Sequence, residues 1–177
     1  MVEIVKIFTA LLNILTLVIA GNLFGKESIF VIVSINSLSF ILAIIFDKGL
    51  AIFNGNISLK KDIFFLKDHF LYKNNIFSSL IFFTIIIVLF FLELELKLIV
   101  ILSLILSIPN LIFLRWRLVK VRDGEFLRAS SITELVPACF KFFLVPLIYF
   151  NVYIYIIFFT IISFIYVINL LNKDEIK

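Results

Sequence analysis

The sequence predicts an all-α polytopic membrane protein, in which one membrane domain over residues 1–177 forms a bundle of six transmembrane helices. The first observation is composition: 63% of the 177 residues are hydrophobic, whereas a soluble domain is about 45–50% apolar. A chain of this length has too much surface for its volume to bury such a share in a core. The second observation is that charged residues gather in short segments between long apolar runs. This pattern is typical of helices that cross a hydrocarbon layer about 30 Å thick.

Charge-free runs set the bounds of the predicted helices, because about 20 apolar residues of helix cross the hydrocarbon. The last such run, residues 142–172, is too long for one span, so we expect a turn near residues 150–152. Continuous apolarity over these lengths excludes the alternating strands of an outer-membrane barrel. The six helices are expected at residues 7–25, 28–59, 74–92, 98–114, 129–150 and 152–171.

Lys and Arg residues predict the orientation. Most of the 16 lie near the N-terminus, in segments 60–73 and 115–128, and after Asn172, which a six-helix topology places on one side. The positive-inside rule assigns that side and both termini to the cytoplasm, in a bacterial inner membrane. Since the basic residues are split between short connections, no nucleic-acid partner is expected. A cleaved signal peptide is the alternative for the first run, but Glu3 offsets the charge of Lys6 there.

The second predicted helix carries one stripe of small and polar residues. Their spacing of three or four keeps them on one helix face, which suits helix contacts or a wet cavity. Asp47 and Lys48 allow two interpretations: they mark the membrane interface, with Lys48 reaching toward water, or Asp47 lines an internal cavity. The stripe consists of Asn36, Ser39, Ala43, Asp47, Ala51, Asn54 and Ser58.

The fifth predicted helix carries a second stripe, formed by Ser130, Glu134, Ala138 and Lys141. Lys141 is expected near the middle of the membrane, where a cation costs about 3 kcal/mol or more and faces the bundle interior. It is either half of a structural ion pair with another helix, Asp47 included, or part of a functional site. Glu134 lies closer to the interface and is too far along the helix to pair directly with Lys141.

Enzyme chemistry has no signature in this sequence. The chain has one His and one Cys, which do not suffice for a metal cluster or an internal disulfide. Neither a G-x-S-x-G elbow nor a phosphate-binding glycine loop occurs. No catalytic residue, metal or cofactor is therefore expected.

Four short elements occur in a fixed order: a glycine-containing hairpin, an Asp-x-Gly-Leu element, a basic stretch after the fourth helix, and a Glu-x-x-Pro element in the fifth. By their order and spacing, the chain resembles polysaccharide (O-antigen type) flippases of the multidrug/oligosaccharidyl-lipid/polysaccharide exporter superfamily. The resemblance covers the sequence from Gly21 to about Tyr166. The elements are residues 25–30, 47–50, 122–126 and 134–137.

The resemblance implies one lobe of a MATE-type transporter and transport of a lipid-linked oligosaccharide of the undecaprenyl-pyrophosphate type, for polysaccharide or lipopolysaccharide biosynthesis. It makes Asp47, Lys48, Glu134 and Lys141 candidates for the substrate or ion pathway. Lys141 would attract the pyrophosphate, while Asp47 and Glu134 would balance charge or bind a coupling H⁺ or Na⁺.

Full-length family members pair two six-helix lobes, and alternating access needs both. The chain is therefore expected to be a fragment, one half of a homodimer, or a half-transporter with a separate partner lobe. Two other functions stay open. One is a membrane interaction subunit or inactive remnant, and the other is half of a small-molecule exporter.

Overall fold

A computed structural model describes residues 1–46, 84–85 and 91–175 of the chain. The elements assigned in these ranges are all helical, and no strand occurs among them, so the all-α class is confirmed for this part of the protein. The regular helices are α1 (Val2–Phe24), α2 (Lys26–Phe46), α6 (Leu94–Arg122), α7 (Phe126–Ser130), α8 (Val136–Leu144) and α9 (Val152–Glu175). Two further turns join them, the π-helical η1 (Ser131–Leu135) and the 3-10 helical η2 (Val145–Tyr149).

Five helical stretches are long and apolar enough to cross a membrane. Their outward faces carry exposed Ile, Leu and Phe side chains along their length, and lipid is the solvent in which such a surface is stable. The chain is therefore a multi-pass membrane protein. The stretches are Val2–Phe24, Lys26–Ile45, Leu94–Leu118, Phe126–Tyr149 and Val152–Leu171. Nearly all of the predicted helix 74–92, and residues 47–59 of the predicted second helix, lie outside the described residues.

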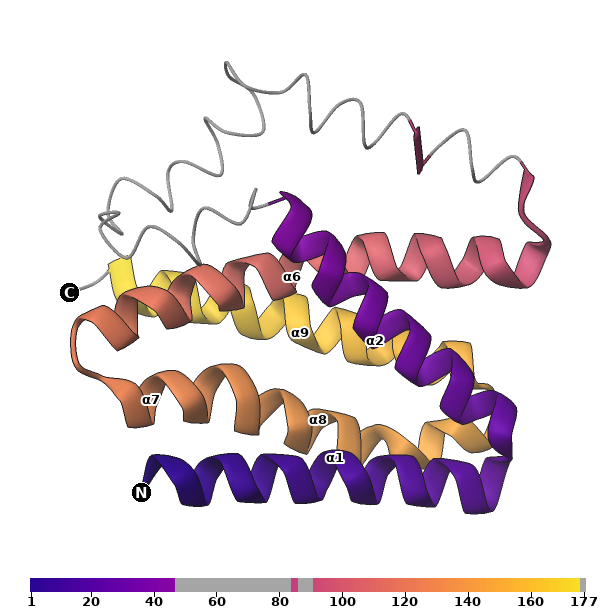
Figure 1. Cartoon of the computed structure of the whole chain (residues 1–177), viewed down its shortest axis with the longest axis horizontal. Helices are drawn as coiled ribbons and strands as arrows, with labels where there is room; N and C mark the ends of the chain where they lie inside the picture. Colours follow the sequence, from indigo (N-terminus) through magenta and orange to yellow (C-terminus); the bar gives the residue numbers. More distant parts are fainter. Residues whose placement is uncertain (47–83, 86–90, 176–177) are drawn as a thin grey trace.

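The described helices run in two directions (Figure 1). α1 and the composite stretch from α7 to η2 lie side by side and run one way, while α2, α6 and α9 run the other way. As a result, α1 begins and α9 ends at the same end of the bundle, which we call the N-terminal end. The side of the membrane that this end faces stays a prediction.

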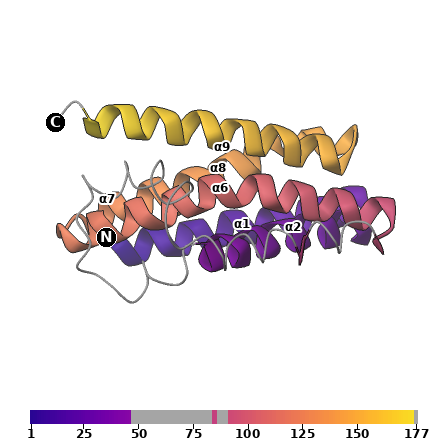
Figure 2. The same cartoon turned by 90° about the horizontal axis from the view of Figure 1, so that it is seen from above.

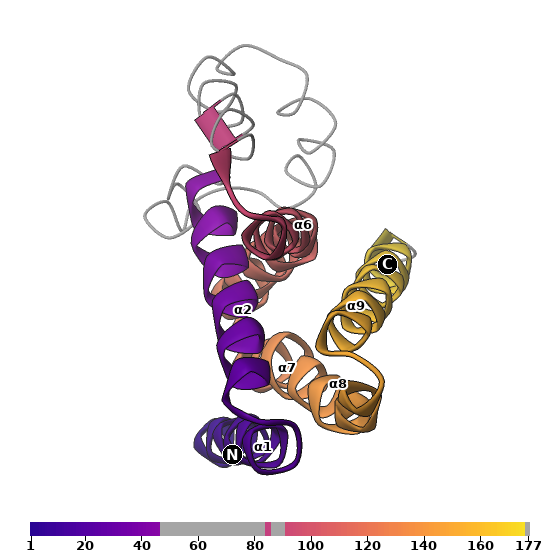
Figure 3. The same ribbon diagram turned by 90° about the vertical axis from the view of Figure 1, so that its right-hand side faces the viewer.

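The view turned about the horizontal axis shows how the layers are ordered (Figure 2). α9 lies on one outer side of the bundle, α1 and α2 lie on the other, and α6 and α8 lie between them. Seen from the end, α6 packs against α2, whereas α8 packs against α1 and α9 (Figure 3). The core is continuous across these contacts and includes Ala20, Ile35, Leu106 and Tyr155.

α2 and α6 form the most extensive helix pair in the described bundle. Ser39 and Ala43 of α2 and Ser103 of α6 are fully buried at this contact. Asn110 Nδ2 donates a hydrogen bond to Ser39 Oγ at 3.0 Å, and the Ser103 hydroxyl lies 3.4 Å from the Ile35 carbonyl oxygen. Small residues let helix backbones approach closely in a membrane, and hydroxyls can bond across the contact. The described part of the small and polar stripe on α2 therefore makes helix contacts.

α6 extends beyond the predicted residues 98–114 at both ends, and it continues through the basic residues up to Arg122. It ends in a Schellman motif, in which Glu125 N–H donates to Lys120 O at 2.8 Å and Gly124 N–H donates to Val121 O at 3.1 Å. Gly124 has a φ of 80°, a conformation that favours glycine at this position. Charge alone did not end the helix, because charged side chains at its end reach water and ion-pair partners. Most of segment 115–128, which was expected as a loop, is therefore helical.

The turn expected near residues 150–152 lies between η2 and α9. Asn151 caps the new helix, since its Oδ1 accepts a hydrogen bond from Tyr153 N–H at 2.7 Å. An Asn at this position satisfies one of the backbone donors left free at a helix start. The chain thus reverses direction within a few residues and brings α9 back along α8.

Candidate functional site

The four candidate residues have different positions relative to the described structure. Asp47 and Lys48 lie outside the described residues, so their roles stay predictions. Glu134 lies on η1 and Lys141 lies on α8. The sequence pattern placed these two side chains on one face of one helix, but their contacts go to different neighbours: Glu134 contacts α6, and Lys141 contacts α9.

Two prolines explain the irregular backbone of the span Phe126–Tyr149, the fourth of the five described spans. Pro137 has no N–H, and in a regular helix its ring would clash with the carbonyl of Thr133. The turn before it widens into a π helix, in which Val136 N–H donates to Ser131 O, five residues back. Thr133 Oγ1 also donates to Ala129 O at 2.8 Å. A π turn holds one more residue than an α turn, so the side chains beyond it are rotated relative to the predicted face.

The second irregularity follows Pro146. The chain tightens there into the 3-10 turn η2, and Phe150 N–H donates to Leu147 O at 3.1 Å, three residues back. The span from Phe126 to Tyr149 therefore consists of four segments with different hydrogen-bond patterns. Lys141 lies on the one segment, α8, that has an irregular turn at each end.

Glu134 forms an ion pair with Arg117 of α6, between Oε1 and Nη1. The side chains are 22% and 39% exposed, respectively, so the pair is partly shielded from water. Arg117 was not a candidate in the sequence, because it fell in a segment expected to be a loop. Arg117 could have been identified from the sequence because Arg117 and Glu134 are both expected near the same membrane interface. The pair ties η1 to α6 and gives Glu134 a partner within the fold.

A cluster of charged residues around a buried indole joins α6 to α7. Trp116 is 2% exposed. Lys120 Nζ lies 5.6 Å and Arg128 Cζ lies 6.0 Å from its ring centroid. Glu125 bridges the two cations, with its carboxylate 2.9 Å from Arg128 Nη1 and 3.8 Å from Lys120 Nζ. We call Trp116, Lys120, Glu125 and Arg128 the α6–α7 cluster, and it anchors α7 to the end of α6.

Lys141 has a different environment. Its Nζ lies 5.3 Å from the ring centroid of Phe159 on α9, a geometry in which the ring face attracts the cation. Phe159 is buried in the core, so the ammonium group points into the bundle. No carboxylate among the described residues lies within ion-pair distance of Lys141. Asp47 lies outside those residues, and its pairing with Lys141 stays a prediction.

Aromatic rings surround this part of the α8–α9 contact. Phe140, which precedes Lys141, meets the Tyr166 ring edge-on at 5.6 Å between centroids, and Tyr166 lies 5.8 Å from Phe113 of α6. Tyr155 is fully buried one turn before Phe159, and its hydroxyl has no hydrogen-bond partner within the described residues. Sequence reasoning missed Tyr155, because nothing in an aromatic-rich apolar run distinguishes an unpartnered tyrosine.

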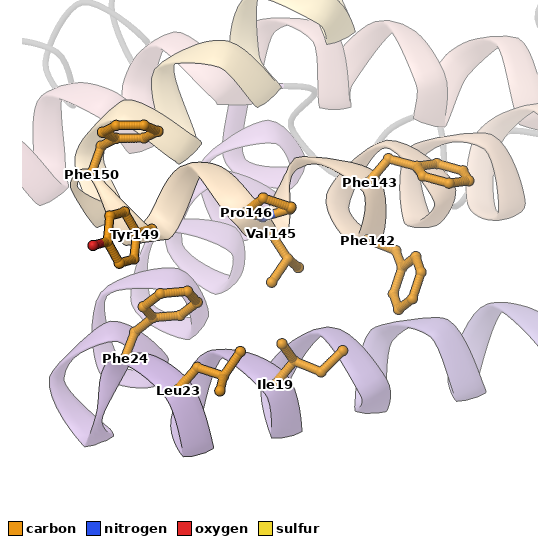
Figure 4. A pocket seen from close by; sticks show the side chains of 9 residues that line it. All are labelled: Ile19, Leu23, Phe24, Phe142, Phe143, Val145, Pro146, Tyr149 and Phe150. Carbon is orange, nitrogen blue, oxygen red and sulfur yellow. The ribbon is translucent and has the colours of Figure 1, made fainter.

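An apolar groove of about 550 Å³ lies between the end of α1 and the α8–η2 stretch (Figure 4). The rings of Phe24, Tyr149 and Phe150 gather at one end of it, and Phe142 and Phe143 stand at the other. Such a surface accepts hydrocarbon chains and offers almost no polar contact. The complete lining is Ile19, Leu23, Phe24, Phe142, Phe143, Val145, Pro146, Tyr149 and Phe150.

The described residues contain no group of three or more His, Cys, Asp or Glu side chains that could hold a metal ion. Their notable polar features are the Arg117–Glu134 pair, the α6–α7 cluster and Lys141. Comparison with protein-family models, characterised proteins and solved structures finds no match for this chain. A functional assignment therefore rests on the residues and geometry described above.

Proposed function

We propose that this chain is one six-helix half of a flippase that moves an anionic, lipid-linked oligosaccharide across a bacterial inner membrane. The cargo would be of the undecaprenyl-pyrophosphate type and serve polysaccharide biosynthesis, as the sequence resemblance implies. The observation that carries the proposal is Lys141, a cation facing the bundle interior with no carboxylate partner among the described residues. Ionisable residues at such positions are rare and mark substrate or ion pathways.

The depth of Lys141 supports this role. It lies about 22 Å along a 24-residue span that is about 36 Å long at 1.5 Å per residue. A pyrophosphate passing this level would meet the ammonium in surroundings of low dielectric constant, where opposite charges attract more strongly than in water. The Phe159 ring gives the cation a weak partner while no cargo is present. A weak resting partner is easily displaced by an anion.

The lipid part of the cargo has a simpler requirement, because a polyprenyl chain needs only an apolar surface. The groove between α1 and η2 supplies such a surface at the end of the bundle opposite the N-terminal end. The cargo would thus keep its hydrocarbon in contact with the bilayer while its charged and polar parts pass through the protein.

Transport further requires a second lobe, since alternating access rocks one lobe against another. The partner lobe would be a second copy of this chain or a separate six-helix protein. A small-molecule exporter half is the second candidate among transporters, but an interior cation disfavours the cationic cargo of many such exporters. A membrane interaction subunit or inactive remnant would carry Lys141 without transport.

The test is a leaflet-exchange assay. The chain is reconstituted in liposomes, alone and together with any six-helix protein encoded next to it, with a fluorescently labelled undecaprenyl-pyrophosphate saccharide. A membrane-impermeant quencher reports the fraction of label in the outer leaflet over time. The proposal expects faster exchange than in protein-free liposomes. If no preparation accelerates exchange, the flippase proposal is wrong and the interaction subunit is favoured.

Lys141→Gln tests the residue in the same assay. We expect the exchange rate to fall about tenfold or more, because a charge-assisted contact contributes about 1.5–3 kcal/mol. Lys97→Gln is the matched control, since Lys97 lies in the first turn of α6, at one end of the bundle and away from its middle. A Lys141→Gln rate equal to that of Lys97→Gln would remove Lys141 from the mechanism while leaving transport itself intact.

A further inference from the structure

The span Phe126–Tyr149 differs from the other four described spans because it departs from α-helical hydrogen bonding twice. α7 leads into the π turn η1, and α8 leads into the 3-10 turn η2. In hydrocarbon, a backbone group without a partner costs several kcal/mol, so a span normally keeps one regular pattern. π turns inside helices are often found at functional sites. The geometry thus isolates α8 as a short rigid segment between two weak points.

The two sides of η1 are held in different ways. On one side, α7 is fixed to α6 by the ion pairs of the α6–α7 cluster and the cation–ring contacts of Trp116. On the other side, α8 packs against α1 and α9 through apolar and aromatic side chains. Its polar link among the described residues is the contact of Lys141 with the Phe159 ring. Apolar contacts are non-directional, so α8 can shift more easily than α7.

Glu134 lies on the π turn itself, and its ion pair reaches back to Arg117 on the anchored side. The pair therefore crosses the boundary between the fixed and the movable parts of the span. From these observations we propose that η1 is a hinge about which α8 swings, and that the Arg117–Glu134 pair is the latch that holds the described position. The hinge would carry Lys141 with it, and this inference holds whatever cargo the protein moves.

Distances between spin labels can separate a hinge from a general loosening of the bundle. Labels are placed at exposed positions by Ile101→Cys on α6, Phe143→Cys on α8 and Leu127→Cys on α7. The background is Cys139→Ala, which removes the chain's single cysteine. The 101–143 pair reports α8, and the 101–127 pair reports the anchored α7. Both are measured in the full chain in lipid nanodiscs.

Glu134→Gln opens the proposed latch without changing side-chain size. We expect the 101–143 distances to fall into two populations, one at the described position of α8 and one displaced from it. Relative to the protein with Glu134, the ratio of displaced to described molecules should rise about fivefold, which corresponds to the loss of a partly exposed ion pair. The 101–127 distances should stay single. Glu3→Gln is the matched control, because Glu3 forms an exposed pair with Lys6 at 3.4 Å within α1, a pair that links no two helices.

Two outcomes would overturn the hinge. If Glu134→Gln and Glu3→Gln give the same 101–143 distances, the pair is no latch. If the 101–143 and 101–127 distances broaden together, the pair holds the fold as a whole and η1 is not a pivot. The double variant Arg117→Glu with Glu134→Arg exchanges the two charges and so allows the ion pair to form again. It should restore the single population of 101–143 distances.

Discussion

Three prolines lie inside described spans, and they have different effects. Pro109 is fully buried in α6, which remains one α-helix from Leu94 to Arg122. Pro137 is preceded by a π turn, and Pro146 is the second residue of a 3-10 turn. Each proline removes one backbone donor and crowds the carbonyl four residues back. The difference between α6, which stays regular, and the span Phe126–Tyr149, which does not, must therefore come from the helices that surround each of them.

The contacts that surround α6 are more directional than those that surround the span Phe126–Tyr149. α6 is held against α2 by close approach of small residues and by the Asn110–Ser39 hydrogen bond, one residue after Pro109. α8 packs mainly through aliphatic and aromatic side chains. Hydrogen bonds require a set geometry, whereas apolar packing tolerates small rotations. We infer that the α2 contact keeps α6 regular across its proline, and that α8 has no equivalent support.

The largest expected effect comes from breaking the α2–α6 contact. Ser39→Leu places a large side chain where the native one is fully buried, and overpacking of this kind costs about 1–3 kcal/mol. We expect a lower unfolding midpoint in a detergent titration and faster amide hydrogen exchange on both sides of Pro109. Phe40→Leu, at a neighbouring exposed position, should change neither. Unchanged exchange around Pro109 in Ser39→Leu would show that α2 does not keep α6 regular.

Replacing Pro137 and Pro109 separately tests whether their two spans respond differently to the loss of a proline. Pro137→Ala restores a donor and removes the clash, so residues 131–136 should move toward α-helical bonding. Their amide exchange should slow by about tenfold, since one added backbone bond in hydrocarbon exceeds the usual 1 kcal/mol. Pro109→Ala should change exchange in α6 by less than about threefold, because that helix is already continuous. Equal effects of the two substitutions would mean that the surroundings do not distinguish these prolines.

The smallest effect is expected from Tyr155, which lies on the α9 side of the core. Its hydroxyl is buried without a hydrogen-bond partner among the described residues, and such a group costs stability. Tyr155→Phe should therefore raise the free energy of unfolding by about 1 kcal/mol. Tyr149→Phe, at a 78% exposed position, should leave it unchanged. A loss of stability in Tyr155→Phe would reveal a partner for this hydroxyl.

Several features could be predicted from local sequence because local chemistry determines them. Within the described residues, the charge-free runs correspond to the five apolar helical spans. The turn expected near residues 150–152 is present, and Asn151 caps the start of α9 there. The small residues of α2 also lie at a helix contact, as the stripe from Asn36 to Ala43 suggested. The spans and the turn depend on contact with lipid or on interactions within a few residues, and the α2 stripe indicates a contact face without naming the helix that it meets.

Other features could not be predicted from the sequence. A regular helix was expected through Pro137, and Glu134 and Lys141 were placed on one face of it. The π turn changed that phase, so Glu134 pairs with Arg117 and Lys141 faces Phe159. α6 was expected to end before Arg115, but it extends to Arg122 because its basic residues found partners in the α6–α7 cluster and elsewhere. Partners on other helices cannot be read from spacing along one helix.

The amino-acid pattern is enough to predict membrane-spanning helices, because backbone groups in hydrocarbon must bond within their own segment and apolar side chains must face lipid. The pairing of charges between helices, and the places where a span departs from regular geometry, became known from the folded arrangement. Ion pairs between helices and the response to proline depend on neighbours far along the chain. The candidate site reflects both levels: the apolar sequence around Lys141 places it within a membrane-spanning segment, and packing turns its ammonium group toward Phe159 of α9.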